Sequence, residues 1–199
     1  MEFLQKKQYF LDLFMKNYYP LLGIRKDSFL KIFHELLKEE KQNYFIIETG
    51  TCRLENNFSG DGMSTILWDQ FINIFSGKVY SVDINENNVN FSRSKVSDKT
   101  SVILSDSVKF LNQLSNDDNL PFIDLLYLDS YDLDWSNPHP SSFHHIKELL
   151  AIKSKVLNNT IIVVDDNNKN AGKGRYIDEF MKNLNKTKLI DDYQIAWKW

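Results

Sequence analysis

NYFIIETGT, residues 43–51, is an apolar and β-branched run that ends in a carboxylate, a threonine and a glycine. Four later segments repeat the pattern of an apolar run that ends in an acidic residue: KVYSVDI (78–84), TSVILSD (100–106), IDLLYLD (123–129) and TIIVVDD (160–166). Strands that are apolar almost throughout are covered on both faces, as they are in parallel sheets. The five segments therefore predict a parallel sheet whose strands end near carboxylates.

Helical patterns lie between the predicted strands, at residues 64–75, 86–96, 107–114, 141–156 and 174–184. Such alternation of strands and helices is typical of α/β domains. Two further helices are predicted before the first strand, the second of them with Asp27 or Ser28 as its N-cap. At the other end, KLIDD (188–192) and YQIAWKW (193–199) have strand character with no helix between them. This tail predicts an antiparallel hairpin at one edge of the sheet.

The chain has 199 residues, 42% of them hydrophobic and 26% charged, which is the range of one globular domain. We expect a single domain over residues 1–199, with a helical cap over 1–42 and a ligand-binding core over 43–199. The formal net charge of −3 provides no basic field, so nucleic acid is not an expected partner. The sequence leaves a homo-oligomer open.

The single cysteine, Cys52, permits no intrachain disulfide, and this favours a reducing compartment, the cytoplasm. Lys6, Lys7 and Asp12 interrupt the apolar N-terminal stretch. An apolar run of about 20 residues is needed to span a membrane, and a shorter one is needed for a signal peptide. We therefore expect neither feature, and no membrane partner.

The acidic strand ends indicate where a ligand binds. In an open α/β sheet, ligands occupy the crevice beyond the carboxyl ends of the strands, near the point where the strand order reverses. Any single carboxylate there also fits a loop or helix-capping role. All five predicted strands end near one, however, and this repetition favours a binding site.

The motifs IIETGT (46–51), GDGMST (60–65), VYSVDI (79–84), ILSDS (103–107) and DLLYLDS (124–130) resemble, in this order, those of class I S-adenosylmethionine-dependent methyltransferases. The resemblance covers residues 44–199 and implies a Rossmann-like, seven-stranded, mostly parallel sheet that ends in the hairpin. It implies S-adenosylmethionine as cofactor, with Glu48 to Thr51 at its methionine part, Asp83 at the ribose, and Asp106 with Ser107 at the adenine. The complete expected cofactor set is Glu48, Thr49, Gly50, Thr51, Gly60, Gly62, Ser64, Thr65, Asp83, Asp106, Ser107 and Asp129.

The loop after the first strand departs from that family's pattern. Residues 52–59 separate the first glycine from Gly60 and Gly62, whereas most members have closely spaced glycines there. Ser64 or Thr65 is predicted to cap the following helix and to present its free backbone donors to the cofactor carboxylate. A surface loop without a ligand is the alternative.

Asp129 and the run Asp165, Asp166, Asn167 resemble the metal ligands of catechol-type O-methyltransferases, which use Mg²⁺. The resemblance implies Asp129, Asp166 and Asn167 as ligands, with Asp165 as a substitute, and a small-molecule acceptor methylated at a hydroxyl oxygen. Oxygen ligands suit a hard cation that lowers the pKa of a hydroxyl. Alternatively, Asp165 and Asp166 only follow the strand and face solvent.

The general base is a separate question, because the lysine that those enzymes carry after the fourth strand is absent here. Asp129, His139, His144 and His145 are the catalytic candidates, and histidine suits the role because its pKa lies near neutrality. A packed or solvated role is the alternative for each histidine.

Three other classes of protein are alternatives to a methyltransferase of small molecules. A nicotinamide oxidoreductase of Rossmann type requires G-x-G-x-x-G between strand and helix, and the glycine spacing here does not match. A nucleobase amino-methyltransferase is expected to have an Asn/Asp-Pro-Pro-aromatic tetrad, where this chain has DSYD at 129–132. A catalytically silent cofactor-binding or regulatory protein with the same fold stays open.

Overall fold

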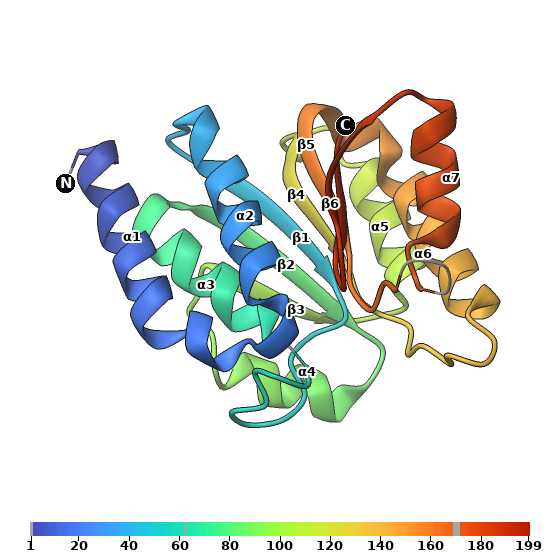
Figure 1. The fold of residues 1–199 in the computed structure, drawn as a ribbon, viewed down its shortest axis with the longest axis horizontal. Helices are drawn as coiled ribbons and strands as arrows, with labels where there is room; N and C mark the ends of the chain where they lie inside the picture. Colours follow the sequence, from blue (N-terminus) through green and yellow to red (C-terminus); the bar gives the residue numbers. More distant parts are fainter. Residues whose placement is uncertain (1, 62, 169–171) are drawn as a thin grey trace.

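The computed structural model describes residues 2–61, 63–168 and 172–199. Within these residues, seven strands form one sheet in the order β3-β2-β1-β4-β5-β7-β6 (Figure 1). The strands are β1 (Tyr44–Thr49), β2 (Gly77–Asp83), β3 (Thr100–Leu104), β4 (Ile123–Leu128), β5 (Val156–Val164), β6 (Thr187–Asp191) and β7 (Ile195–Lys198). Strands β1 to β5 are parallel, and β7 is antiparallel to β5 and β6. The predicted fold class, a Rossmann-like sheet with a C-terminal antiparallel hairpin, is confirmed.

Helices cover both faces of the sheet. They are α1 (Phe3–Asn17), α2 (Lys26–Leu36), α3 (Ser64–Phe75), α4 (Glu86–Arg93), α5 (Ser107–Ser115), α6 (His139–Ile152) and α7 (Arg175–Asn183), with short 3-10 turns at Tyr19–Leu21, Gly23–Arg25, Leu37–Glu39 and Lys153–Lys155. One core cluster joins the sheet to α1, α2 and α3, and a second joins its other face to α5, α6 and α7 (Figure 1). Every residue of the central strands β1 and β4 is buried, which accounts for their largely apolar sequences.

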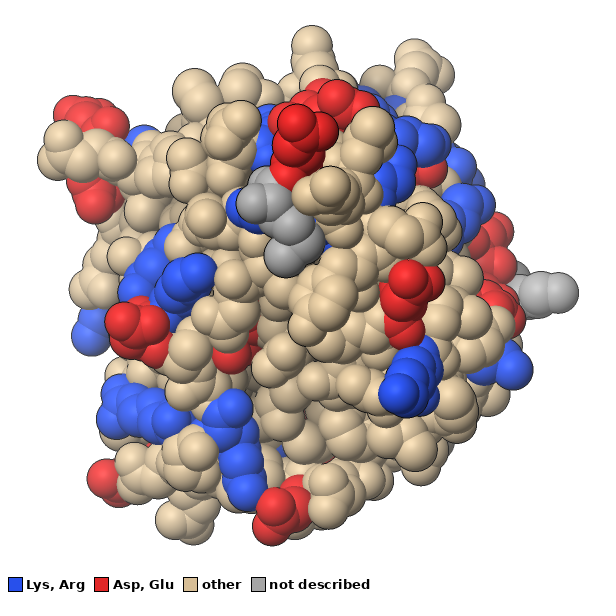
Figure 2. Space-filling model, turned by 90° about the vertical axis from the view of Figure 1, so that its left-hand side faces the viewer, with Lys and Arg blue, Asp and Glu red and all other residues tan. Residues whose placement is uncertain are grey.

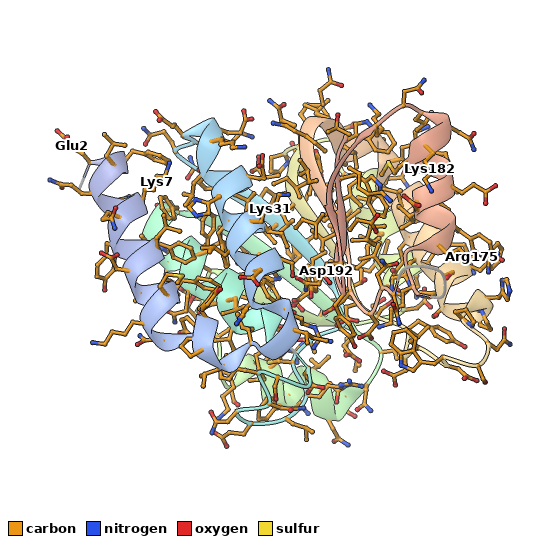
Figure 3. All side chains as sticks on the ribbon, viewed as in Figure 1. Glu2, Lys7, Lys31, Arg175, Lys182 and Asp192 are labelled. Atoms are coloured by element: carbon orange, nitrogen blue, oxygen red, sulfur yellow. The ribbon has the colours of Figure 1, made fainter. Side chains whose placement is uncertain are left out.

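Aromatic side chains pack the two N-terminal helices against each other and against α3. The centroid of the Phe10 ring lies 4.7 Å from that of Phe33 in α2 and 5.2 Å from that of Phe71 in α3, and both pairs are edge to face. Such pairs add to the stabilisation from apolar burial. Lys31 of α2, labelled in Figure 3, donates a hydrogen bond to the carbonyl of Leu189 in β6. These contacts fix the segment between α1 and α2, which carries Arg25, against the body of the domain.

The predicted capping residues were wrong at two helices. Helix α2 begins at Lys26 rather than after Asp27 or Ser28, because Asp27 accepts from the Tyr19 hydroxyl and Ser28 donates to the carbonyl of Arg25. Helix α3 begins at Ser64 as predicted, but its N-cap is Met63, with a left-handed φ of 50° and no side-chain cap.

The end of α6 also differs from the prediction. The helix ends at Ile152, whereas the sequence pattern extended it to Val156. Val156 instead begins β5, where it pairs with Ile123 of β4. The apolar side chain fits both helical and strand patterns, and the pairing with the neighbouring strand decides between them.

None of the described helices has the length and apolar content needed to cross a membrane. On the face drawn in Figure 2, basic and acidic side chains lie among one another rather than in separate fields. This mixture agrees with the small formal net charge of −3.

Candidate active site

The strand order reverses at β1, which lies between β2 and β4, so the ligand crevice is expected beyond the carboxyl ends of these strands. A cleft of about 300 Å³ occupies this place. Its walls include Gly50 and Thr51 after β1, Asp83 at the end of β2, Asp129 and Ser130 after β4, Asp166 and Lys173 after β5, and Gly60, Ser64 and Arg25. Residues distant in sequence thus converge on one cleft.

A second cavity, of about 290 Å³, adjoins the first and shares Asp83, Ile84 and Ser130 with it. Its other walls are Val82, Asp106, Ser107, Tyr131 and His144. Three of the wall residues, Val82, Ile84 and Tyr131, have apolar bodies. The two cavities therefore offer a polar chamber and a more apolar one, with Asp83 at their junction.

Gly50 allows β1 and β4 to approach each other at the bottom of the cleft. Its φ is +79°, and a Cβ atom there would lie 2.5 Å from the carbonyl oxygen of Asp129. Only glycine satisfies both conditions without strain. The position is thereby tied to the placement of the Asp129 backbone.

Asp83 is held at the junction by three donors. Its carboxylate accepts from the backbone N–H of Asn85 at 2.7 Å, from the Asn88 amide at 3.2 Å and from the backbone N–H of Thr51 at 3.3 Å. A carboxylate has about four acceptor sites, so about one remains for a hydroxyl of a ligand. Asp83 is thus oriented, half-buried and able to accept from a ligand's hydroxyl.

Glu48, Thr49 and Thr65 lie behind the cleft rather than along it. The Glu48 carboxylate is fully buried and accepts from Ser81 Oγ at 2.5 Å, Thr65 Oγ1 at 2.6 Å and Trp68 Nε1 at 3.0 Å. Burial raises the pKa of Glu48 to about 7, although these hydrogen bonds oppose the rise. The residue links β1, β2 and α3 inside the domain.

Asp106 and Ser107 reach the second cavity from the start of α5. Asp106 is the N-cap of that helix and accepts from the backbone N–H of Lys109 at 2.8 Å. Ser107 Oγ lies 2.9 Å from His144 Nε2. Of the remaining expected cofactor residues, Gly62 lies outside the described residues.

A cluster of charged side chains closes the cleft at the β4 and β5 ends. The Lys173 ammonium lies 2.5 Å from Asp129 Oδ1 and 2.9 Å from Asp166 Oδ2. Arg25 Nη2 lies 3.1 Å from Asp166 Oδ1, and Arg25 Nε lies 2.9 Å from Asp165 Oδ2. We call these five residues, Arg25, Asp129, Asp165, Asp166 and Lys173, the charged cluster. Three carboxylates and two cations give it a formal charge of −1.

The pKa shifts follow the pairing within the charged cluster. Burial tends to lower the pKa of Lys173, but the charges of Asp129 and Asp166 outweigh it and raise that pKa. Burial tends to raise the pKa of Asp166, but the Lys173 charge holds it below its ordinary value. Burial raises the pKa of Asp129 despite the same ammonium. Lys173 is therefore a fixed cation in the pH range of ordinary enzymes.

The expected metal ligands do not come together as a metal site. Asp129 and Asp166 share the Lys173 ammonium, and Asp165 is held by Arg25 and accepts from the Tyr127 hydroxyl at 2.6 Å. Asn167 turns away from the cleft, because its amide donates at 3.2 Å to the carbonyl of Asp192, a residue of the β6–β7 turn that is labelled in Figure 3. Among the described residues, no three His, Cys, Asp or Glu side chains are grouped as ligands. The arrangement does not fit a divalent cation.

The three candidate histidines occupy different environments. His144 lines the second cavity, 3.3 Å from the buried Glu148 carboxylate. His145 is fully buried, its Nδ1 is bonded to the carbonyl of Ser141 at 2.6 Å, and burial lowers its pKa to about 4. His139 is exposed and pairs with the Tyr176 hydroxyl at 2.7 Å. Only His144 among them lines either of the two cavities.

Arg25 and Lys173 were not predicted from the sequence as site residues. Lys173 stands between Gly172 and Gly174, where Cβ atoms would lie 2.4 Å from Asn167 Cα and from Ile195 Cγ2, respectively. In the sequence, a lysine between two glycines shortly after an acidic strand end indicates a closely packed loop. Nothing local marks Arg25, whose partners in the charged cluster, Asp165 and Asp166, are at least 140 residues away.

The sequence model of the O-methyltransferase family matches residues 61–197, which is more than half of the chain. The protein therefore belongs to a family of the class I S-adenosylmethionine-dependent methyltransferase type, as its motifs predicted. More specifically, it is a member of the O-methyltransferase family. A search of the curated proteins found no match to the sequence.

Solved structures resemble the fold at low sequence identity. The O-methyltransferase NovP is 13% identical with a TM-score of 0.59, and the match covers 96% of this chain and 98% of NovP. NSun6 from Pyrococcus horikoshii is also 13% identical, with a TM-score of 0.57 over 81% of this chain and 41% of NSun6. MycE, a methyltransferase of the mycinamycin biosynthetic pathway, is 17% identical with a TM-score of 0.49, and the chain spans about a third of its length.

Proposed function

We propose that this protein binds S-adenosylmethionine across the two adjoining cavities and transfers its methyl group to a hydroxyl oxygen of a small molecule. The observation that carries the proposal is the position of Asp83, a pre-oriented carboxylate at the junction of a polar and a more apolar cavity. An apolar cavity, a carboxylate and a polar cavity follow one another here, and this succession suits a ligand with an aromatic base, a diol and a charged tail. Membership of the O-methyltransferase family supports the reaction class.

The adenine is assigned to the second cavity, between the apolar bodies of Val82, Ile84 and Tyr131. Asp106 and Ser107 are available there for the polar edge of the base, and Asp83 accepts from a ribose hydroxyl. The methionine part is assigned to the first cavity, beside Gly50 and Ser64. Glu48, Thr49 and Thr65 support this cleft from behind without lining it.

The charge of the cleft favours the same assignment. The charged cluster carries a formal charge of −1 and lies beside Gly50 in the first cavity. A sulfonium carries +1, and opposite charges attract more strongly in a partly buried site than in water. The cluster therefore stabilises the cationic form of the cofactor.

Bound S-adenosylmethionine supplies the methyl group as an electrophile. The chain's task is to hold the acceptor in line and to remove its proton. Asp129 is assigned as the proton acceptor, because its side chain keeps 22% of its surface accessible and lines the first cavity. His145 and His139 do not line this cavity, and His144 is assigned to the adenine side.

The test measures binding and turnover separately. Calorimetry with S-adenosylhomocysteine should give binding, and radiolabelled S-adenosylmethionine should methylate members of a panel of small hydroxylated compounds but not their amine analogues. Asp129→Asn should lower kcat about 100-fold, the usual order for a lost general base. The matched control is Asp132→Asn, which removes an exposed carboxylate from the same cleft.

Two results would contradict the proposal in different ways. Absence of S-adenosylhomocysteine binding would remove the cofactor assignment itself. Binding without methylation of any hydroxyl in the panel would favour the catalytically silent alternative, while methylation of amines would change the acceptor class.

A further inference from the structure

We propose that the Lys173 ammonium takes the place of a divalent cation in this site and donates a hydrogen bond to the acceptor's oxygen, an inference that rests on the proposed function. Family resemblance suggested a metal at the ends of β4 and β5. The described residues place a fixed organic cation there instead.

The first support is the position of Lys173. Its side chain is only 2% accessible, yet it lines the cleft between Asp129 and Asp166. An ammonium has three donors. Two are used, at 2.5 Å and 2.9 Å, and the described residues offer no partner to the third. That donor is available to an acceptor oxygen beside Asp129.

The second support is the way Arg25 completes the cluster. Its guanidinium bonds both Asp165 oxygens, at 3.0 Å and 2.9 Å from Nε, and it contacts Asp166 through Nη2. The Tyr193 ring lies 4.6 Å from the guanidinium carbon, and its hydroxyl donates to Asp166 at 2.6 Å. Asp165 and Asp166 are therefore held by cations and hydroxyls that a metal would have to displace.

The third support is the charge balance. With all five groups ionised, the cluster carries a formal charge of −1, which a sulfonium of +1 neutralises. Adding a divalent cation would change the cluster to +1, and two positive groups would then share a partly buried cleft. Like charges repel strongly in a partly buried cleft, so the ammonium and a divalent cation exclude each other from this site.

The chemistry of an ammonium here resembles one part of what a metal does. It polarises the acceptor hydroxyl and holds its oxygen beside Asp129, which receives the proton as the new O–C bond forms and the C–S bond breaks, leaving its electrons on sulfur. A single hydrogen-bond donor orients one oxygen, whereas a metal binds two neighbouring ones. The site therefore does not require a catechol-like diol.

The first experiment uses Mn²⁺ alone and does not depend on activity. Free Mn²⁺ is followed by electron paramagnetic resonance during titration of the wild type, of Lys173→Ala and of Lys41→Ala. The control removes another lysine paired with a carboxylate, Asp124, away from the cleft. We expect Lys173→Ala to bind one Mn²⁺ at least 10-fold more tightly than the wild type and the control, because it frees Asp129 and Asp166.

Tight Mn²⁺ binding by the wild type, or equal weak binding by all three proteins, would overturn the proposal that Lys173 takes the place of a metal. Neither result depends on whether an acceptor has been found. The outcome is thus separate from any failure of the proposed methyl transfer.

The second experiment concerns turnover on an acceptor found in the hydroxyl panel. The wild type should keep its rate in EDTA, and Lys173→Met should lose about 100-fold in kcat, the order expected for a lost electrostatic donor. Lys173→Arg should recover part of the rate, and the S-adenosylhomocysteine Kd of each variant reports whether the cleft has folded. Loss of activity in EDTA, or a Lys173→Met variant with the wild-type kcat and Kd, would overturn the assignment.

Discussion

Arg25 Nε lies 2.9 Å from Asp165 Oδ2, so a side chain from the N-terminal helical segment pairs with the end of β5. Both side chains are almost completely buried. Removing one partner of such a pair leaves an uncompensated charge and costs about 3–5 kcal/mol. Arg25→Met should lower the free energy of unfolding by this amount, measured by urea denaturation.

The control for Arg25 is Arg53, which also bridges two carboxylates, Asp61 and Asp132, but is 45% accessible. Exposed ion pairs contribute about 0–1 kcal/mol. Arg53→Met should therefore change stability little. Equal losses in the two variants would show that burial of the Arg25 pair is not the source of its effect.

The Arg25 pair is an example of a contact that cannot be predicted from local sequence patterns. The five acidic strand ends were predictable, because apolar runs and their boundaries are local patterns. A contact across 140 residues depends on how the cap packs on the sheet, and no local pattern contains that information. The same limit applies to Asn167, whose side chain is turned by the β6–β7 turn.

The orientation of Glu48, in contrast, could have been predicted from the two-residue period of a β-strand. Side chains two residues apart in a strand share a face. Ile46 belongs to the core cluster with α3, and Glu48 accordingly bonds Thr65 and Trp68 of that helix. The acidic residue at the strand end thus faces the interior, although the family resemblance implied cofactor contact.

Asp83 gives the direct test of the ribose assignment. Asp83→Ala should raise the Kd for S-adenosylhomocysteine about 10- to 100-fold, because a charged acceptor for a ribose hydroxyl is worth about 1–3 kcal/mol. Calorimetry measures this, with Glu86→Ala as the control for loss of a nearby exposed carboxylate. Unchanged affinity in Asp83→Ala would refute the assignment.

The histidines separate cofactor binding from proton transfer. His144 lines the cavity assigned to adenine, so His144→Ala should raise the S-adenosylhomocysteine Kd about 10-fold while kcat at saturation stays near the wild-type value. His139→Ala should change neither quantity, because His139 lines neither of the two cavities. A large fall in kcat for His144→Ala, with normal Kd, would instead make His144 the base.

The last prediction concerns the pH dependence of stability and follows from Glu48. Burial raises its pKa to about 7 in the folded protein, against an ordinary value of 4.5. Between these values the folded protein binds more protons than the unfolded one, so this group lowers the free energy of unfolding as pH rises. The loss is complete above the folded-state pKa and absent below pH 4.5. Glu48→Gln removes the titration.

The quantity to measure is therefore the difference in unfolding free energy between Glu48→Gln and the wild type, at several pH values from 4.5 to 8. From pH 4.5 to pH 8, the unfolding free energy of Glu48→Gln should rise by about 2–3 kcal/mol relative to that of the wild type, since one pKa unit corresponds to about 1.4 kcal/mol. Comparing differences removes the contributions of the other groups. Glu55→Gln, at an exposed carboxylate, corrects for the loss of one charge. A difference that stays constant with pH would mean that Glu48 ionises in the folded protein as readily as in the unfolded chain.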